Sequence, residues 1–143
     1  MKADAKTEAE IRALLTRLTD SYEERDLEGF MACFAPDPDT VLYGTGADEK
    51  RIGPAEIQIQ TQRDWDQTEA ISMAFGWTSV SAAGPVAWAA IDGSFNIHAG
   101  GQEFTIPARV SFVLEKRDDR WLIVHCHFSA PAAGQEEGES IPV

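Results

Sequence analysis

The chain has 143 residues, of which 43% are hydrophobic and 25% charged, a composition typical of one globular domain. Its 24 acidic and 12 basic residues give a formal net charge of −12. Because nucleic acids and anionic membranes are bound through clustered lysines and arginines, this excess of acid argues against both as partners.

The cellular setting is inferred from apolar runs and cysteines. The N-terminal residues lack an apolar signal core, and no apolar run is long enough to span a bilayer. Cys33 and Cys126 each lie within an apolar pattern, where thiols are more often buried and reduced than paired in a disulfide framework. A cytoplasmic protein is therefore expected.

The first part of the chain predicts helices. Thr7 and Glu10 fit a capping box, which predicts a helix over residues 8–24. Asp26 is suited to cap a second, short helix that prolines bring to an end. The first helix carries one apolar stripe at helical spacing, formed by Ile11, Leu14, Leu15, Leu18 and Tyr22.

The rest of the chain predicts one short strand, one helix and then a run of long strands. Residues 39–44 form the short strand, and Pro54 begins a helix to about residue 68 whose apolar stripe is weak. From residue 70 onward, alternating segments are joined by glycine- and aspartate-containing turns, which predicts antiparallel strands. Helices followed by a meander indicate an α+β domain over residues 1–131, with a flexible acidic tail over residues 132–143.

The stretch from Trp121 to Pro131 has the most distinctive pattern. Strict alternation puts Leu122, Val124, Cys126 and Phe128 on one face of the strand. The other face then carries two imidazoles and a hydroxyl, and consists of Trp121, Ile123, His125, His127 and Ser129.

Two segments resemble the NTF2-like (SnoaL-like) superfamily over residues 7–131. The first runs from Arg25 to Phe30 and continues in Phe34-Ala-Pro-Asp37. The second, Trp121-x-Ile-Val-His-x-His-x-Ser-x-Pro131, is similar to the last strand of the association domain of calcium/calmodulin-dependent kinase II and its bacterial relatives. The resemblance implies a cystatin/NTF2-like cone, in which a curved antiparallel sheet wraps around a long N-terminal helix and two shorter helices.

The resemblance also implies a pocket between the concave sheet and the helices, and dimerisation through the outer sheet face. The pocket arginines of the kinase association domain fall near Asp92, Phe112 and Phe128, so the positive charge of that pocket is absent here. The catalytic Tyr and Asp of ketosteroid isomerases, which share the fold, correspond to Leu18 and Tyr43, so that machinery is absent in this form.

The expected pocket is mostly apolar. Residues on the helix-facing side of the sheet are expected to line it, with larger aromatic side chains at its rim, although plain core packing explains most of them equally well. The predicted ligand-binding residues are Tyr22, Tyr43, Trp65, Trp88, Phe112, Cys126 and Phe128.

Asp92 is the candidate catalytic acid or base. The family alignment turns it toward the cavity, where apolar surroundings would raise its pKa. Simple alternation instead sends Asp92 outward with Ser94 and Asn96, and Gly93 is the place where a β-bulge would reconcile the two arrangements.

Arg109, His125 and His127 share the other face of the last two strands. Two histidines at i and i+2 can chelate a metal, with His98 as a third ligand, but no further cysteine or close carboxylate pair completes the set. We therefore predict no metal, and a polar cluster at a dimer interface instead. No glycine-rich phosphate loop is present, so no cofactor is expected.

These patterns predict an NTF2-like homodimer whose apolar pocket binds a small molecule. Two alternatives stay open at this point. A SnoaL-like isomerase, cyclase or hydrolase would use Asp92 as its acid or base, and an oligomerisation module would have a filled cone.

Overall fold

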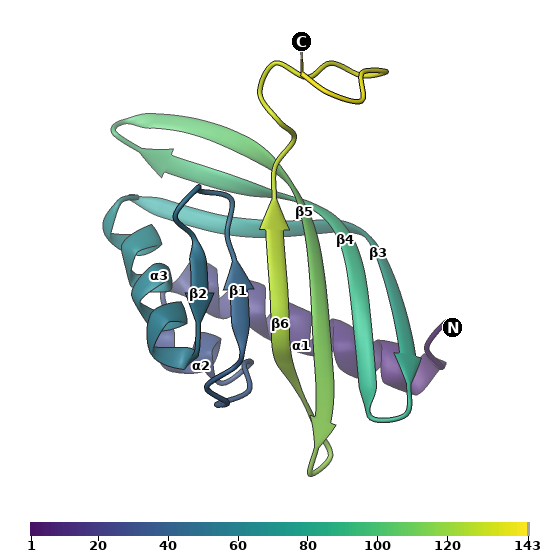
Figure 1. Ribbon diagram of the computed structural model, residues 1–143. Coiled ribbons are helices and arrows are strands. Elements are labelled where there is room, and N and C mark those ends of the chain that lie inside the picture. The colour runs from purple at the N-terminus through teal and green to yellow at the C-terminus, as the bar shows by residue number, and fades with distance from the viewer. Residues whose placement is uncertain (143) are drawn as a thin grey trace.

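Residues 1–142, which a computed structural model describes, form three helices and one six-stranded sheet (Figure 1). The helices are α1 (Ala5–Glu24), α2 (Leu27–Met31) and α3 (Pro54–Asp66). The strands are β1 (Val41–Tyr43), β2 (Lys50–Ile52), β3 (Ala70–Ala83), β4 (Val86–Ala99), β5 (Gln102–Arg117) and β6 (Arg120–Ser129). The strand order is β2-β1-β6-β5-β4-β3, and because β1 is parallel to β6 the sheet is mixed. The predicted α+β cone is confirmed.

Helix α1 begins three residues before the predicted start. Asp4, not Thr7, is its N-cap, and Oδ1 of Asp4 accepts a hydrogen bond of 2.7 Å from the backbone N–H of Thr7. Glu10 does not close a capping box, because its Oε2 accepts a hydrogen bond of 2.8 Å from Nε1 of Trp121 in the sheet. The carboxylate assigned to the cap thus fastens the helix to the last strand.

The apolar stripe of α1 packs on the inner face of the sheet, across which the helix runs in Figure 1. At its end Arg25 has a left-handed backbone with φ of 59°. The Arg25 guanidinium donates hydrogen bonds to the carbonyl oxygens of Trp65, at 2.6 Å, and Thr68, at 2.9 Å. These bonds join the C-terminal ends of α1 and α3, and α2 begins immediately afterwards at its predicted cap, Asp26.

A β-bulge divides β3, one of the long strands that curve across the molecule in Figure 1. Gly76 and Trp77 together lie opposite the single residue Asp92. The extra residue turns Trp77 to the outer face, where it is 63% exposed. The neighbouring strand comes so close that a Cβ on Gly93 would lie 2.7 Å from the carbonyl oxygen of Ala74. Without this extra residue, strict alternation from Ile71 through Phe75 would place Trp77 on the inner face.

A second bulge corrects the predicted faces of the last strand. Val113 pairs with His125 and Leu114 with Ile123, which leaves Val124 as an extra residue in β6. The strand therefore changes faces once along its length. Its buried residues before and after the bulge are Trp121, Ile123, Cys126 and Phe128, so two residues predicted to accompany the histidines lie in the core instead.

Beyond β6, residues 130–142 contain turns but neither helix nor strand. The flexibility of residues 132–143 stays a prediction, and Val143 lies outside the described residues. Across the described part of the chain, no helix has both the length and the apolar character needed to cross a membrane.

Candidate functional site

A cavity of about 220 Å³ lies between the inner face of the sheet and the helices, beside the β1–β2 connection. Its volume is below the usual range for drug-sized ligands, so a small molecule fits it. One wall is polar and comes mainly from α3 and the β1–β2 connection. The other wall is apolar and comprises Phe30, Leu42, Ile71, Met73, Phe95, Ile97 and Phe128.

A wider hollow of about 440 Å³ opens at the far end of β3, β4 and β5. It is a shallower site, because most of its lining residues are exposed. His98 there lies 3.1 Å from Glu69 and 3.8 Å from Glu103, both of which are more than half exposed. The smaller cavity is the better candidate, since its polar groups are withdrawn from solvent and held by one another.

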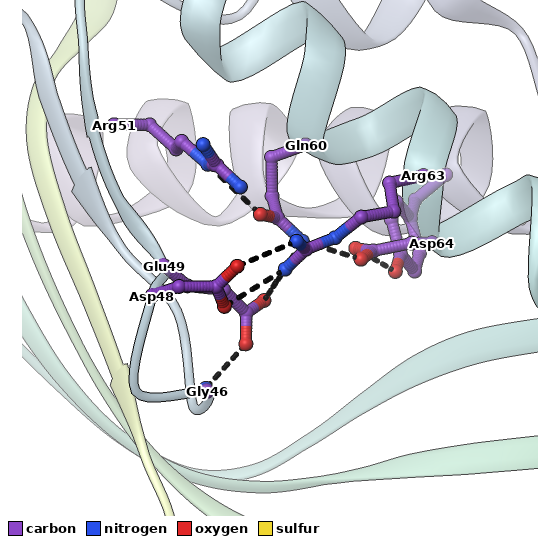
Figure 2. A network of polar contacts seen from close by, with 8 residues as sticks. Gly46, Asp48, Glu49, Arg51, Gln60, Arg63 and Asp64 are labelled. Atoms are coloured by element: carbon purple, nitrogen blue, oxygen red, sulfur yellow. Dashed lines mark hydrogen bonds and ion pairs between the residues drawn. The ribbon is translucent and has the colours of Figure 1, made fainter.

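Gln60 on α3 is the centre of the polar wall (Figure 2). It is 4% exposed, and its Nε2 donates hydrogen bonds of 2.8 Å to Oε1 of Glu49 and to Oδ1 of Asp64. Its Oε1 accepts a hydrogen bond of 2.9 Å from Nε of Arg51. Every hydrogen-bonding group of this amide except one lone pair is thereby used, which fixes both carboxylates in place.

Oδ2 of Asp64 also accepts a hydrogen bond of 2.8 Å from the hydroxyl of Tyr22. Burial raises the pKa of Asp64, an effect that the hydrogen bonds from Tyr22 and Gln60 partly oppose. Burial and the adjacent carboxylate raise the pKa of Tyr22 as well, so its hydroxyl keeps its proton. The cavity therefore contains a carboxyl group that protonates more readily than a solvent-exposed aspartate.

Arg63 lies at the edge of the polar wall and is directed toward the β1–β2 connection (Figure 2). Its guanidinium donates hydrogen bonds of 2.8 and 3.2 Å to the two oxygens of Asp48. It lies 4.0 Å from Oε1 of Glu49, whose Oε2 accepts from the backbone N–H of Gly46. These contacts hold the β1–β2 connection against α3 and keep Glu49 at the cavity.

Of the seven predicted ligand-binding residues, Tyr22 and Phe128 line the cavity. Trp65, Phe112 and Cys126 are buried in the core and do not contact it. The Phe112 ring stands edge-on to Phe128 with centroids 6.0 Å apart, and burial raises the pKa of Cys126. Core packing, the alternative left open above, accounts for these three residues.

Tyr43, Trp88 and Asp92 are exposed on the outer face of the sheet, opposite the cavity. Asp92 follows the buried Ile91 and pairs in register with the exposed Arg109, as simple alternation indicated. The family alignment was misleading here, because the bulge lies in β3 and leaves the faces of β4 unchanged. The expectations that Tyr43 and Trp88 line the cavity and that Asp92 faces it are therefore corrected.

The polar cluster of Arg109, His125 and His127 also lies on the outer face. The Tyr43 ring lies beside both imidazoles, with centroids 5.1 Å from His127 and 6.4 Å from His125. Arg109 donates a hydrogen bond of 3.3 Å to the carbonyl oxygen of Ala130 rather than to an imidazole. Within residues 1–142, no group of three or more His, Cys, Asp or Glu side chains is arranged to hold a metal ion.

The sequence did not single out Glu49, Gln60, Arg63 or Asp64. One signal was present, because the apolar stripe of α3 is weak. Gln60 and Thr61 occupy buried positions of that helix, where an ordinary amphipathic helix carries apolar residues. A polar residue on the buried face of a helix indicates a hydrogen-bonded partner inside the fold.

The sequence pattern of the SnoaL-like domain matches residues 11–133. The chain belongs to the SnoaL-like family. This confirms the resemblance to the NTF2-like superfamily that the two sequence segments indicated. A search of curated protein sequences gave no match.

Solved structures of the superfamily are similar over almost the whole chain. An NTF2-like superfamily protein from Salmonella enterica serovar Typhimurium has a TM-score of 0.85 and 23% identity, covering 97% of this chain and 100% of that one. An NTF2-like protein of unknown function from Pseudomonas putida has a TM-score of 0.78 and 21% identity, with coverages of 98% and 95%. A protein from Xanthomonas campestris, whose name assigns it to the association domains of calcium/calmodulin-dependent protein kinase II, has a TM-score of 0.76 and 25% identity, with coverages of 87% and 87%.

Proposed function

We propose that this SnoaL-like protein binds a small, largely apolar molecule in the cavity between sheet and helices, and that it acts as a homodimer. The observation that carries the proposal is the cavity itself, which has an apolar wall facing a wall of buried, hydrogen-bonded polar groups. Ligand sites commonly have this character, with apolar surface providing affinity and a few fixed polar groups providing orientation.

The cavity also weighs against an oligomerisation module with a filled cone. Part of the space inside the sheet is filled, since the rings of Phe75 and Phe128 stand edge-on to Phe112 with centroids 6.1 and 6.0 Å away. Toward α3 the packing stops, and open volume remains between Met73 and Gln60. The wall of this open volume around the buried Gln60 is polar, whereas a filled cone would be expected to continue the apolar packing.

An enzyme remains the second candidate, now with Asp64 in place of Asp92. A carboxyl group in a cavity with a raised pKa is suited to exchange a proton with a bound substrate. If the protein is an enzyme of this kind, Asp64→Asn abolishes turnover of a substrate that still binds. Turnover that survives Asp64→Asn would contradict this second candidate.

The homodimer is proposed from the outer face of the sheet. That face exposes the large side chains Tyr43 and Trp88, which are 38% and 39% exposed, and it also carries the paired positions Asp92 and Arg109. In a two-fold interface the same surface meets itself, so a face carrying an acid next to an arginine is complementary to its own copy. The cytoplasmic location stays a prediction.

Binding is tested by blocking the cavity. Wild type is compared with Ile97→Trp, which fills the cavity, and with Ile59→Trp, a matched change at a 61% exposed position on the outside of α3. Thermal unfolding is followed with small aromatic and aliphatic alcohols, amines and carboxylates. A ligand at a hundredfold excess over its Kd stabilises the native state by about 2.7 kcal/mol. Stabilisation of wild type and Ile59→Trp, but not of Ile97→Trp, supports the proposal, and equal behaviour of all three refutes it.

A further inference from the structure

The buried part of the polar wall, around Gln60, presents hydrogen-bond acceptors and few free donors. Both N–H groups of Gln60 are used on Glu49 and Asp64, and the Tyr22 hydroxyl hydrogen is used on Asp64. The Thr61 hydroxyl donates a hydrogen bond of 2.9 Å to the carbonyl oxygen of Ile57. A ligand group that reaches this buried part of the wall therefore meets hydrogen-bond acceptors and is best matched by a donor.

The two cavity carboxylates keep acceptor capacity after these bonds are made. Oδ1 of Asp64 and Oε1 of Glu49 each accept one hydrogen bond from the same Nε2 atom of Gln60, at 2.8 Å in both cases. A carboxylate oxygen has two acceptor positions, so each of these oxygens can accept another donor. Because both oxygens surround one nitrogen atom, a single small donor group can reach both of them.

The charges around this wall leave it negative. Asp48, Glu49 and Asp64 are opposed by the guanidinium groups of Arg51 and Arg63. Arg63 is engaged bidentately by Asp48, whose side chain is 70% exposed, and Arg51 donates to the neutral Gln60 amide. The nearest guanidinium contact of Glu49 is the one of 4.0 Å from Arg63, and its hydrogen bonds, like those of Asp64, come from neutral donors.

We propose that the ligand is a small primary amine with an apolar or aromatic body, bound as the ammonium ion with its N–H groups on Glu49 and Asp64. This inference rests on the proposed function of the cavity as a binding site. An ammonium group has three donors and no acceptor, which matches the wall in both charge and hydrogen bonding. The apolar body lies against Met73, Phe95 and Phe128. A carboxylate ligand would instead meet like charge in a site of reduced dielectric, which disfavours it.

The test compares head groups on constant apolar bodies. Calorimetric titrations at pH 7 use 2-phenylethylamine, 2-phenylethanol and 3-phenylpropionate, and then hexylamine, hexanol and hexanoate. Within each series the amine is expected to bind at least tenfold more tightly than the alcohol, and the carboxylate least tightly. Glu49→Gln and Asp64→Asn are each expected to lower amine affinity at least fivefold and alcohol affinity by a smaller factor. Asp66→Asn, on the exposed side of α3, is the matched control and is expected to change neither.

The outcomes separate the amine inference from the small-molecule binding on which it rests. Alcohols that bind as tightly as amines, or amine affinity that is indifferent to both carboxylate substitutions, would overturn the amine inference and leave small-molecule binding in place. Carboxylates that bind most tightly would overturn it as well. If no member of either series binds wild type or any variant, both the inference and the binding function proposed above are contradicted.

Discussion

The hydroxyl of Tyr22 donates a hydrogen bond of 2.8 Å to Oδ2 of Asp64 and thereby joins α1 to α3 across 42 positions of the chain. Tyr22 is 3% exposed, so the bond is shielded from bulk solvent. The contact lies at the cavity and connects the stability of the fold to the electrostatics of the proposed site.

Tyr22→Phe is expected to destabilise the protein by about 1–2 kcal/mol, because it leaves a buried carboxylate without one of its donors. Tyr43→Phe, which removes a hydroxyl from the exposed outer face, is the matched control and is expected to change stability by less than about 0.5 kcal/mol. Urea unfolding of the two variants measures the difference. Equal destabilisation by both would show that the bond to Asp64 contributes nothing.

Stability is expected to depend on pH through Asp64 in a direction opposite to that of most carboxylates. Since burial raises its pKa above the ordinary 3.8, the folded state holds the proton more tightly than the unfolded chain. The resulting stabilisation is complete below pH 3.8 and is lost as the pH rises through the raised pKa. The unfolding free energies of wild type and Asp64→Asn are measured from pH 3 to 8. The stability of the variant relative to wild type is expected to increase progressively as the pH rises.

Asp37 supplies the control of opposite sign. Hydrogen bonds from Arg117, at 2.8 and 2.5 Å, hold the pKa of Asp37 below 3.8. Its contribution is present above pH 3.8 and is lost as the pH falls through the lowered pKa. Asp37→Asn is therefore expected to be most harmful at neutral pH. The same sign of pH dependence for Asp37→Asn and Asp64→Asn would contradict this account of one of the two groups.

The bulge in β3 is expected to make Gly93 much less tolerant of a side chain than Gly76. A Cβ on Gly93 would lie 2.7 Å from a backbone carbonyl oxygen, whereas one on Gly76 would lie 3.3 Å from the oxygen of Asp92. Gly93→Ala is expected to cost on the order of 2 kcal/mol, as overpacking typically does, and Gly76→Ala distinctly less. Urea denaturation checks the order, and a Gly76→Ala variant that is the less stable of the two would reverse it.

Self-association is expected to depend on the outer face of the sheet. Trp88→Glu introduces a charge on the same face of β4 as Asp92 and is expected to weaken a dimer at least tenfold by sedimentation velocity. Ile59→Glu places the same residue on the helical side, where it is expected to leave association unchanged. A dimer that tolerates Trp88→Glu while wild type is dimeric would assign the interface to another surface.

Much of the fold follows from periodicity. The stripe of α1, the cap Asp26 and the Pro54 helix start each predicted an element close to its observed place. Strand β2 was not predicted, because Lys50–Ile52 is too short and polar to show alternation. The predicted faces of β6 were partly wrong, since a bulge moves every later residue to the other face and periodicity alone does not show the extra residue.

The candidate site was harder to predict than the fold. Tyr22 and Phe128 were identified, because large residues on the inner face are natural lining residues. Glu49, Gln60 and Asp64 were missed, because the network between them depends on how α3 folds back on the β1–β2 connection. In the sequence Gln60 and Asp64 look like the surface of an ordinary charged helix, and only the weakness of that helix's apolar stripe indicated otherwise.

The most direct test of ligand binding in the cavity is an NMR titration of the methionine methyl groups with 2-phenylethylamine and 2-phenylethanol. The chain has three methionines, of which Met73 lines the cavity and Met1 is 79% exposed. Our account predicts a saturable shift of the Met73 methyl signal with at least one of the two compounds, no shift at Met1, and loss of the effect in Ile97→Trp. A Met73 signal that stays unchanged, or that shifts equally in Ile97→Trp, would contradict binding in this cavity.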